Sequence, residues 1–264
     1  MSEEPLVLSE RRGAIEVLTL NRPPVNALNR ALLDAILHAV EACARDHDVR
    51  AVVLPGGRRA FSAGADIREV EPHSDAAVRD WIGHGQRVLN EIASINRPVV
   101  AAIEGFCLGG GRELALACHM RVAGRGAELG LPEIKLGIIP GFGGTQRLPR
   151  LVGSGAALEL MLTGDPFGPE RALATGLVNR VVDSGAAVAA AAQLAATVAA
   201  RSATAAAAIL RVYHGGIDHH FRQDLSRELD EITAAVHSVD GREGLRAFVE
   251  KRPAVFEAPP PSYF

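Results

Sequence analysis

The pattern of apolar positions divides the chain into two unlike halves. In the first half, short apolar runs at 14–20, 51–54 and 98–105 have the length and composition of buried strands. Apolar residues recur at helical spacing in 31–45 and 75–94, between those runs. Strands that alternate with helices predict an α/β core with parallel or mixed strand pairing.

The second half is rich in alanine from about 154 to 237 and has one clear strand pattern, LVNRVV at 177–182. Because alanine is the best helix former, this region predicts a helical layer packed on the core. No Ser/Gly-rich linker separates the halves. We therefore assign residues 1–195 to the core and 196–264 to a C-terminal helical region of the same domain. The final EAPPPSYF is expected to be extended or disordered.

Composition excludes several classes of protein. The 264 residues are 48% hydrophobic and 22% charged, with a formal net charge of -3 and no basic stripe, so we expect no nucleic-acid binding. No uncharged apolar run reaches about 18 residues, and the polar first ten residues do not resemble a secretory signal. The cysteines, Cys43, Cys107 and Cys118, form no CxxC pair. We expect a cytoplasmic protein with neither a membrane span nor a structural zinc.

Two glycine-rich or small-residue turns follow predicted strands. In GFCLGGGREL, at 105–114, three glycines precede a predicted helix at 112–120 and leave backbone N–H groups open at its positive end. Such a turn can stabilise an oxyanion, or it can be a tight turn that needs glycine for packing. It has neither the Lys-Ser/Thr of a phosphate-binding loop nor GxGxxG spacing. AFSAGADI, at 60–67, is a second loop of this kind, or an ordinary surface turn.

Two carboxylates lie near these turns in the sequence. Glu113 stands just inside the glycine-opened helix, and Glu133 lies in GLPEIKLGIIPG. Each alone has a structural explanation: Glu113 complements the helix N-terminus, and Glu133 is a satisfied or solvent-facing carboxylate. A pair of carboxylates beside an oxyanion hole would instead suit acid/base catalysis.

The ordered motifs AFSAGADI, GFCLGGGREL, LGLPEIKLGIIPGFGGTQRLPRLVG and GLVNRVV resemble the enoyl-CoA hydratase/isomerase (crotonase) family. NRPPVNALN and EGLRAFVEKRPAVF extend the resemblance over almost the whole chain. It implies an α/β fold, a crotonase-like ββα superhelix core with a C-terminal helical layer that serves oligomerisation. It also implies a homotrimer or a hexamer built from two trimers.

The resemblance implies hydration of a trans-2-enoyl-CoA to a 3-hydroxyacyl-CoA. The N–H groups of Ala65 and Gly110 match the oxyanion hole, Glu113 matches the carboxylate that deprotonates water, and Glu133 matches the one that protonates Cα. Gly141 matches a position whose N–H helps to hold the water. The acyl-CoA thioester is the substrate, and neither a metal nor a redox cofactor is implied.

For the coenzyme A portion, Ala63, Asp66, Ile67 and Arg68 match positions that lie against the nucleotide. Arg68 is a candidate phosphate partner, or a solvated surface arginine. By the same resemblance, Lys251 could reach the ligand of a neighbouring subunit.

Three positions depart from the family pattern: Arg112, where an apolar residue or cysteine is usual, His119 in place of aspartate, and Leu129 in place of phenylalanine. They leave the catalytic pair intact but bear on acyl preference, and a histidine at an apolar helix end is most often structural. We expect Trp81, Ile82 and Leu89 to belong to the core or to line the acyl pocket rather than to act in catalysis, and the core is the favoured place.

Within the family, the alternatives are a Δ3-Δ2 enoyl-CoA isomerase, which relies mainly on the Glu133 position, and a specialised hydratase or dehydratase. From other classes, an RNA-binding relative would need a lysine-rich helix, whereas RALLDAILHAVEACARD contains no lysine. A serine hydrolase would need a motif such as GxSxG, which the chain lacks.

Overall fold

The computed structural model describes residues 4–69 and 74–255. Its strands are β1 (Val7–Arg12), β2 (Ile15–Leu20), β3 (Ala51–Pro55), β4 (Ala60–Ser62), β5 (Val99–Ile103), β6 (Phe106–Leu108), β7 (Met120–Gly124), β8 (Glu128–Gly130) and β9 (Arg180–Val182). Its helices are α1 (Arg30–Arg45), α2 (Asp75–Ser94), α3 (Gly110–Ala117), α4 (Gly144–Val152), α5 (Ser154–Thr163), α6 (Pro169–Ala174), α7 (Ala187–Ala199), α8 (Ala203–His237) and α9 (Val239–Glu250). Two 3-10 turns are η1 (Ile67–Glu69) and η2 (Pro132–Leu136).

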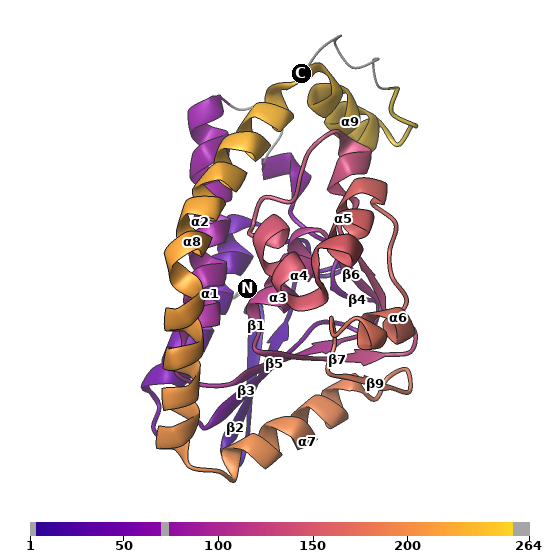
Figure 1. The fold of residues 1–264 in the computed structure, drawn as a ribbon. Coiled ribbons are helices and arrows are strands. Elements are labelled where there is room, and N and C mark those ends of the chain that lie inside the picture. Colours follow the sequence, from indigo (N-terminus) through magenta and orange to yellow (C-terminus); the bar gives the residue numbers. More distant parts are fainter. Residues whose placement is uncertain (1–3, 70–73, 256–264) are drawn as a thin grey trace.

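The strands form two sheets. The larger has the order β1-β2-β3-β5-β7-β9, and the smaller has the order β4-β6-β8. Apart from the antiparallel pair β1 and β2, neighbouring strands in both sheets are parallel. Each pair β3–β4, β5–β6 and β7–β8 sends its first strand to the larger sheet and its second to the smaller, and a helix follows (Figure 1). The predicted α/β superhelix of ββα units is confirmed.

The inner strands of the larger sheet, β2, β3, β5 and β7, are buried on both faces, which explains why they are nearly continuous apolar runs. The edge strand β1 is exposed and polar. Alternate residues point to opposite faces, so Val52 and Leu54 join one core while Ala51 and Val53 join the other. On the second face, α7 lies against the sheet (Figure 1). The residues of α7 buried in this core are alanines at four-residue spacing: Ala187, Ala191, Ala195 and Ala199. Their small side chains let the helix approach the strands closely.

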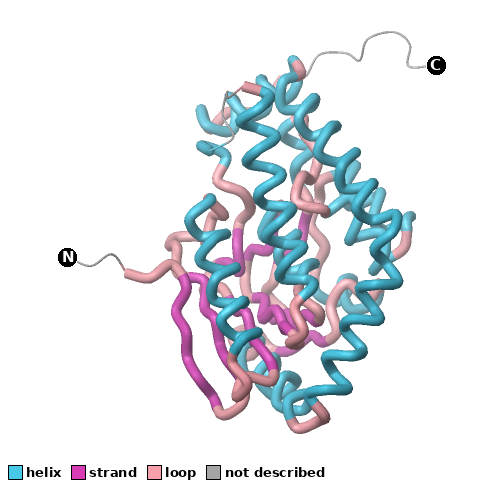
Figure 2. Tube along the Cα trace, turned by 90° about the vertical axis from the view of Figure 1, so that its left-hand side faces the viewer, coloured by secondary structure: helices cyan, strands magenta, loops and turns pink. Residues whose placement is uncertain are grey.

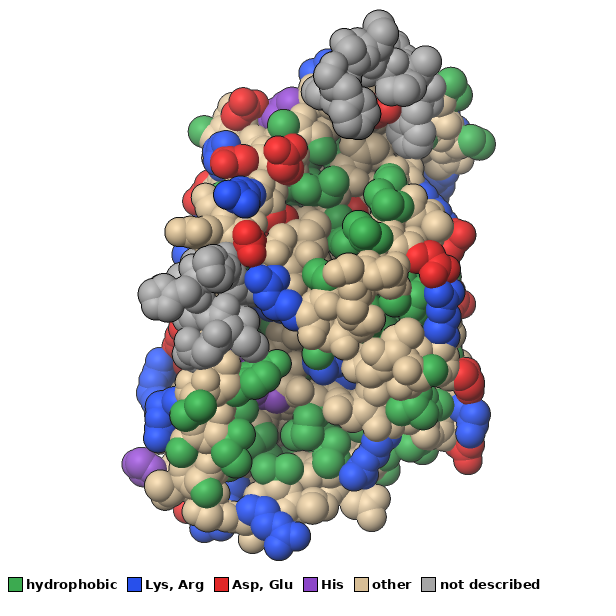
Figure 3. All heavy atoms as spheres, in the orientation of Figure 1, with side chains coloured by type: hydrophobic (Ala, Val, Ile, Leu, Met, Phe, Trp, Pro, Cys, Tyr) green, Lys and Arg blue, Asp and Glu red, His purple; other side chains and the backbone are tan. Residues whose placement is uncertain are grey.

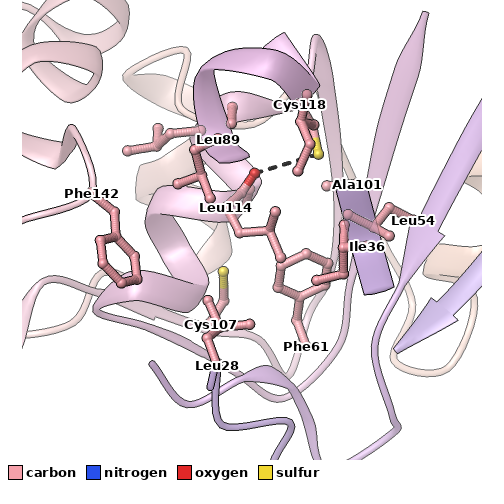
Figure 4. Close-up of a cluster of buried hydrophobic side chains, with 14 of the residues drawn as sticks. Leu28, Ile36, Leu54, Phe61, Leu89, Ala101, Cys107, Leu114, Cys118 and Phe142 are labelled. Carbon is pink, nitrogen blue, oxygen red and sulfur yellow. Dashed lines mark hydrogen bonds between the residues drawn. The ribbon is translucent and has the colours of Figure 1, made fainter. Parts of the chain in front are cut away.

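The other core lies between the larger sheet, α1, α2 and α3. Figure 4 shows Leu54 and Ala101 of the sheet facing Ile36 of α1 and Phe61, with Leu114 of α3 close by. Phe142, from the loop before α4, joins the same cluster. The glycine turn that opens α3 is thus fixed on a rigid core rather than on a surface loop.

The C-terminal helices cover one side of this core. Figures 1 and 2 show α8 as a long helix beside α2, with α9 at the end of the molecule where α8 finishes. Gln86 of α2 donates a hydrogen bond to the Leu225 carbonyl of α8, at 3.2 Å. The predicted boundary after residue 195 falls inside α7, which packs on the core, so this division stays a prediction.

Several predicted boundaries are wrong. The helix expected at 112–120 ends at Ala117, and Met120 already begins β7. The loops at 60–67 and 105–114 contain the three-residue strands β4 and β6, which are too short to show a period of two. Only Arg180–Val182 of the strand expected at 177–182 is extended. The EAPPPSYF segment lies outside the described residues.

No single helix within residues 4–69 and 74–255 is long and apolar enough to cross a membrane, although the bent pair Ala187–Ala199 and Ala203–His214 has the necessary length and composition. Within the same residues, no group of three or more His, Cys, Asp or Glu side chains is arranged to hold a metal ion.

Candidate active site

The two glycine-containing turns meet because β4 and β6 are neighbours in the smaller sheet. Ala65 follows β4, and Gly110 opens α3 directly after β6. A Cβ atom on Gly110 would lie 3.2 Å from the amide nitrogen of Ala65, so only glycine leaves space between them. In the described part of the chain neither N–H has a hydrogen-bond acceptor. Two open N–H groups side by side at a helix N-terminus suit an oxyanion.

Glu113 lies one turn into α3, and it is buried. The sequence alone allowed Glu113 to interact with the N-terminus of its own helix, but its carboxylate makes no hydrogen bond there among the described residues. Instead, Oε1 accepts hydrogen bonds from the N–H groups of Phe142, at 2.8 Å, and Gly144, at 2.6 Å. Glu113 therefore holds the loop that leads into α4.

Glu133 stands in η2 and is also buried. The alternative that it faces solvent is therefore wrong. Its Oε1 lies 3.0 Å from where a Cβ of Gly109 would stand, next to the open N–H of Gly110. Oε2 is buried and has no hydrogen-bond partner among the described residues. A buried oxygen without a partner is costly in a folded protein and points to a role with substrate or water.

Both carboxylates have raised pKa values, and Glu133 contributes to the shift of Glu113. Burial raises the pKa of Glu113 well above its usual value, and the negative charge of Glu133 raises it further. Burial raises the pKa of Glu133 to about 7, while the positive charge of Arg112 opposes that increase. A carboxyl group such as Glu133, which titrates near neutral pH, can exchange a proton with a reacting molecule.

A third buried carboxylate, Glu228 of α8, lies at the same loop. It accepts hydrogen bonds from the N–H groups of Gly143, at 2.5 Å, and Thr145, at 3.0 Å. The motifs in the sequence did not single out Glu228. The sequence feature that could have pointed to Glu228 is its helical spacing from the apolar residues Leu225 and Ile232, which puts a carboxylate on the buried face of α8.

Gly141 lies on this loop, between α2 and α8. A Cβ atom there would lie 3.1 Å from Ile232 and 3.2 Å from Ile82, so these two side chains border the position. The Gly141 carbonyl accepts a hydrogen bond from Gln86, at 3.0 Å. Its own N–H has no hydrogen-bond acceptor within the described residues.

The predicted coenzyme A residues lie together around η1. Asp66 is buried and accepts hydrogen bonds from Arg22, at 2.7 Å, and from Arg68, at 3.0 Å and 3.1 Å. Although burial alone would raise its pKa, these two guanidinium groups hold the pKa of Asp66 below its usual value. Ala63 and Ile67 are half-buried. The sequence motifs did not single out Arg22, which is a second cation beside the 77% exposed side chain of Arg68.

Arg112 is the least expected residue near the site. Its side chain is 1% exposed, yet none of its guanidinium nitrogens has a hydrogen-bond acceptor among the described residues. The guanidinium carbon lies 6.0 Å from the centre of the Phe167 ring. Burial lowers the pKa of Arg112 to about 10, so it stays charged at neutral pH.

Burial and contacts describe the remaining singled-out positions. His119 is held by the Val99 N–H, which donates to Nδ1 at 3.0 Å, as expected for a structural histidine. Leu129 is buried and pairs with Phe167 through two backbone hydrogen bonds. Lys251 is exposed at the end of α9. The predicted core positions are all buried: Trp81, Ile82 and Leu89.

The arrangement can therefore polarise a carbonyl oxygen at two N–H groups, with buried Glu133 next to them and buried Glu113 within electrostatic range of Glu133. A family model described as enoyl-CoA hydratase/isomerase matches residues 10–259. The chain belongs to the enoyl-CoA hydratase/isomerase family. Like the relatives that carry the name enoyl-CoA hydratase, this family member is an enzyme acting in CoA-related metabolism.

Among curated relatives of this hydratase/isomerase family member, a probable enoyl-CoA hydratase of Bacillus subtilis is 40% identical over 92% of this chain and 95% of its own. A crotonyl-CoA hydratase of Syntrophomonas wolfei is 38% identical over 97% of this chain and 99% of its own. Among solved structures, a carnitinyl-CoA hydratase of Mycobacterium avium has a TM-score of 0.84 at 36% identity, covering 96% of this chain and 99% of its own.

Proposed function

We propose that the protein is an enoyl-CoA hydratase, which adds water across the double bond of a trans-2-enoyl-CoA to give a 3-hydroxyacyl-CoA. The open N–H groups of Ala65 and Gly110 bind the thioester oxygen. Charge that moves onto this oxygen makes Cβ electrophilic, and the two N–H groups stabilise the developing enolate.

Glu113 and Glu133 then divide the proton transfers. The Glu113 carboxylate takes a proton from water while the water oxygen bonds to Cβ and the double-bond electrons move toward the thioester oxygen. When the enolate collapses, Glu133 gives its proton to Cα. The Gly141 N–H orients the water. These steps balance without a metal or a redox cofactor.

One observation carries this proposal: buried Glu133 lies next to the open N–H of Gly110, and buried Glu113, in the first turn of α3, is close enough for the charge of Glu133 to raise its pKa. A single carboxylate would be enough for a Δ3-Δ2 isomerase. The presence of Glu113, held in place by Phe142 and Gly144, therefore favours hydration over isomerisation. A specialised hydratase or dehydratase of the same family would use the same groups.

The two reactions are separated by offering the purified enzyme crotonyl-CoA and a 3-enoyl-CoA in turn. Hydration removes the absorbance of the conjugated enoyl-thioester, whereas isomerisation of a 3-enoyl-CoA creates it. We expect rapid loss of absorbance with crotonyl-CoA. An enzyme that is inert toward crotonyl-CoA but converts the 3-enoyl-CoA is an isomerase, and the hydratase proposal fails.

We also propose that the enzyme is a homotrimer or a pair of trimers. Exposed apolar side chains on the first half of α8 support such an assembly: Ile209, Val212 and Tyr213. Hydrophobic side chains gather on the lower part of the face seen in Figure 3, where α7 and the start of α8 lie. Sedimentation velocity tests this proposal, and a monomer at micromolar concentration would contradict it.

A further inference from the structure

The first turn of α4 has no capping side chain of its own. Gly143 occupies the N-cap position, and the sequence GFGGT offers no side chain that accepts from the helix N-terminus. The first N–H groups of a helix need acceptors, and the partial positive charge of a helix N-terminus favours carboxylates. Glu113 supplies one carboxylate from α3, and Glu228 supplies the other from α8.

Both carboxylate oxygens of Glu228 accept hydrogen bonds from the start of α4 and the residue before it. Besides the N–H groups of Gly143 and Thr145, it accepts a hydrogen bond from the Thr145 hydroxyl and one from Gln86, at 3.2 Å. Gln86 also donates to the Gly141 carbonyl. The peptide on each side of Phe142 is thereby fixed from α2 and α8 as well as from Glu113.

We propose that Glu228 is a positioning residue for the reaction, because it holds segment 141–145, and with it the Gly141 N–H and the Glu113 carboxylate, in the geometry that water addition needs. This inference rests on the proposed hydratase function. It also gives the C-terminal helical layer a part in the active site, since α8 contributes a buried side chain to it.

Glu228 also acts through its charge. The groups that face it are Gln86 from α2, Glu113 from α3 and Thr145 and Arg147 from α4, with Glu133 of η2 within electrostatic range. After burial and the charge of Glu133, the charge of Glu228 is the next cause that raises the pKa of Glu113. Removing it lowers that pKa, so a base at Glu113 becomes ionised at lower pH.

Two substitutions separate position from charge. Glu228→Gln keeps the length of the side chain but removes the charge and half of its accepting capacity. Glu228→Asp keeps the charge but is one methylene too short to reach both Gly143 and Thr145. Glu231→Gln, on the exposed face of the same helix, is the matched control.

We expect kcat for crotonyl-CoA hydration to fall about tenfold or more in both Glu228 variants, with KM changed by less than about threefold. In Glu228→Gln the acid limb of the kcat profile moves to lower pH, whereas in Glu228→Asp it stays in place. Glu231→Gln behaves as wild type. The proposal is overturned if both Glu228 variants keep the wild-type kcat, or if only KM rises.

Hydrogen exchange provides a readout independent of activity. The amides of 141–147, followed by mass spectrometry, should exchange about tenfold faster in Glu228→Gln, while those of the core strand 99–103 keep wild-type rates. If the wild type fails to hydrate crotonyl-CoA, the proposed function falls and exchange alone decides the positioning role. Unchanged exchange at 141–147 would show that Glu228 does not hold the segment.

Discussion

Oε1 of Glu113 lies 2.6 Å from the amide nitrogen of Gly144, so a carboxylate on α3 caps the first turn of α4. A Cβ atom on Gly144 would lie 2.8 Å from the same oxygen, so any larger residue there would have to displace the Glu113 carboxylate. Because the backbone donors all meet Oε1, Oε2 is the oxygen that can face a water. The capping contact therefore orients the proposed base.

The proposed oxyanion hole can be tested by a steric change at Gly110. Gly110→Ala places a methyl group 3.2 Å from the Ala65 nitrogen and against the Phe142 ring, where the thioester oxygen would bind. We expect kcat/KM to fall by about 10²-fold or more, the usual cost of losing one oxyanion donor. Gly155→Ala is the control, because nothing lies within 4 Å of its added carbon. Equal activity in the two variants would place the oxyanion elsewhere.

Burial of Glu133 predicts a pH-dependent stability. Its pKa is raised to about 7 in the folded protein, so folding favours its protonated form; that contribution is complete below its ordinary pKa and is lost as pH rises through 7. Glu133→Gln removes the proton linkage. Measured by urea unfolding, the variant should gain up to about 3 kcal/mol relative to wild type between pH 5 and pH 8. A difference that does not change with pH would contradict this.

Arg112 has no hydrogen-bond acceptor among the residues that the structure describes, so its removal should make the fold more stable. Arg112→Met replaces a buried charge by an apolar chain of similar length and should raise the free energy of unfolding by about 1–3 kcal/mol. Because Arg112 opposes the rise in the pKa of Glu133, the variant should also move the Glu133 titration to higher pH. Arg171→Met, whose guanidinium lies 4.0 Å from the same Phe167 ring but is half exposed, is the control. A loss of stability in Arg112→Met alone would show that Arg112 has a partner.

Arg68 tests the proposed coenzyme A contact. Its guanidinium is exposed and held beside η1 by Asp66, a place from which it can meet a phosphate. We expect Arg68→Ala to raise KM for crotonyl-CoA about threefold to tenfold while kcat is unchanged. The chemical step should not respond, because the Arg68 guanidinium bonds Asp66 rather than Glu113 or Glu133. An unchanged KM would identify Arg68 as a solvated surface residue.

Regular spacing of apolar residues was sufficient to predict the longer helices and strands from the sequence. The apolar face of 31–45, with Leu32, Leu33, Ile36, Val40 and Cys43, is the buried face of α1. The three-residue strands β4, β6 and β8 were missed because their pairing depends on the winding of the whole chain rather than on local periodicity. The end of α3 was missed because Cys118 and Met120 continue an apolar pattern across a change from helix to strand.

At the site, the resemblance of short motifs was enough to single out Glu113, Glu133, Ala65 and Gly110 as candidates. Glu228 escaped because it stands 85 residues after Gly143 in an ordinary amphipathic helix, with no motif around it. Arg112 was noticed as a departure, but its burial without a partner is a property of the packed fold. The contacts of Glu228 and the burial of Arg112 depend on residues that are far apart in the sequence, so local sequence patterns cannot predict them.

In the proposed mechanism, two carboxylates share the proton transfers of hydration. The most direct measurement is the loss of enoyl-thioester absorbance of crotonyl-CoA with wild type, Glu113→Gln and Glu133→Gln, each checked for an intact fold. We predict rapid hydration by wild type and a fall in kcat of about 10²-fold or more in each variant, since each lost acid/base group is worth about that much. A Glu113→Gln variant that hydrates crotonyl-CoA at the wild-type rate would contradict the mechanism.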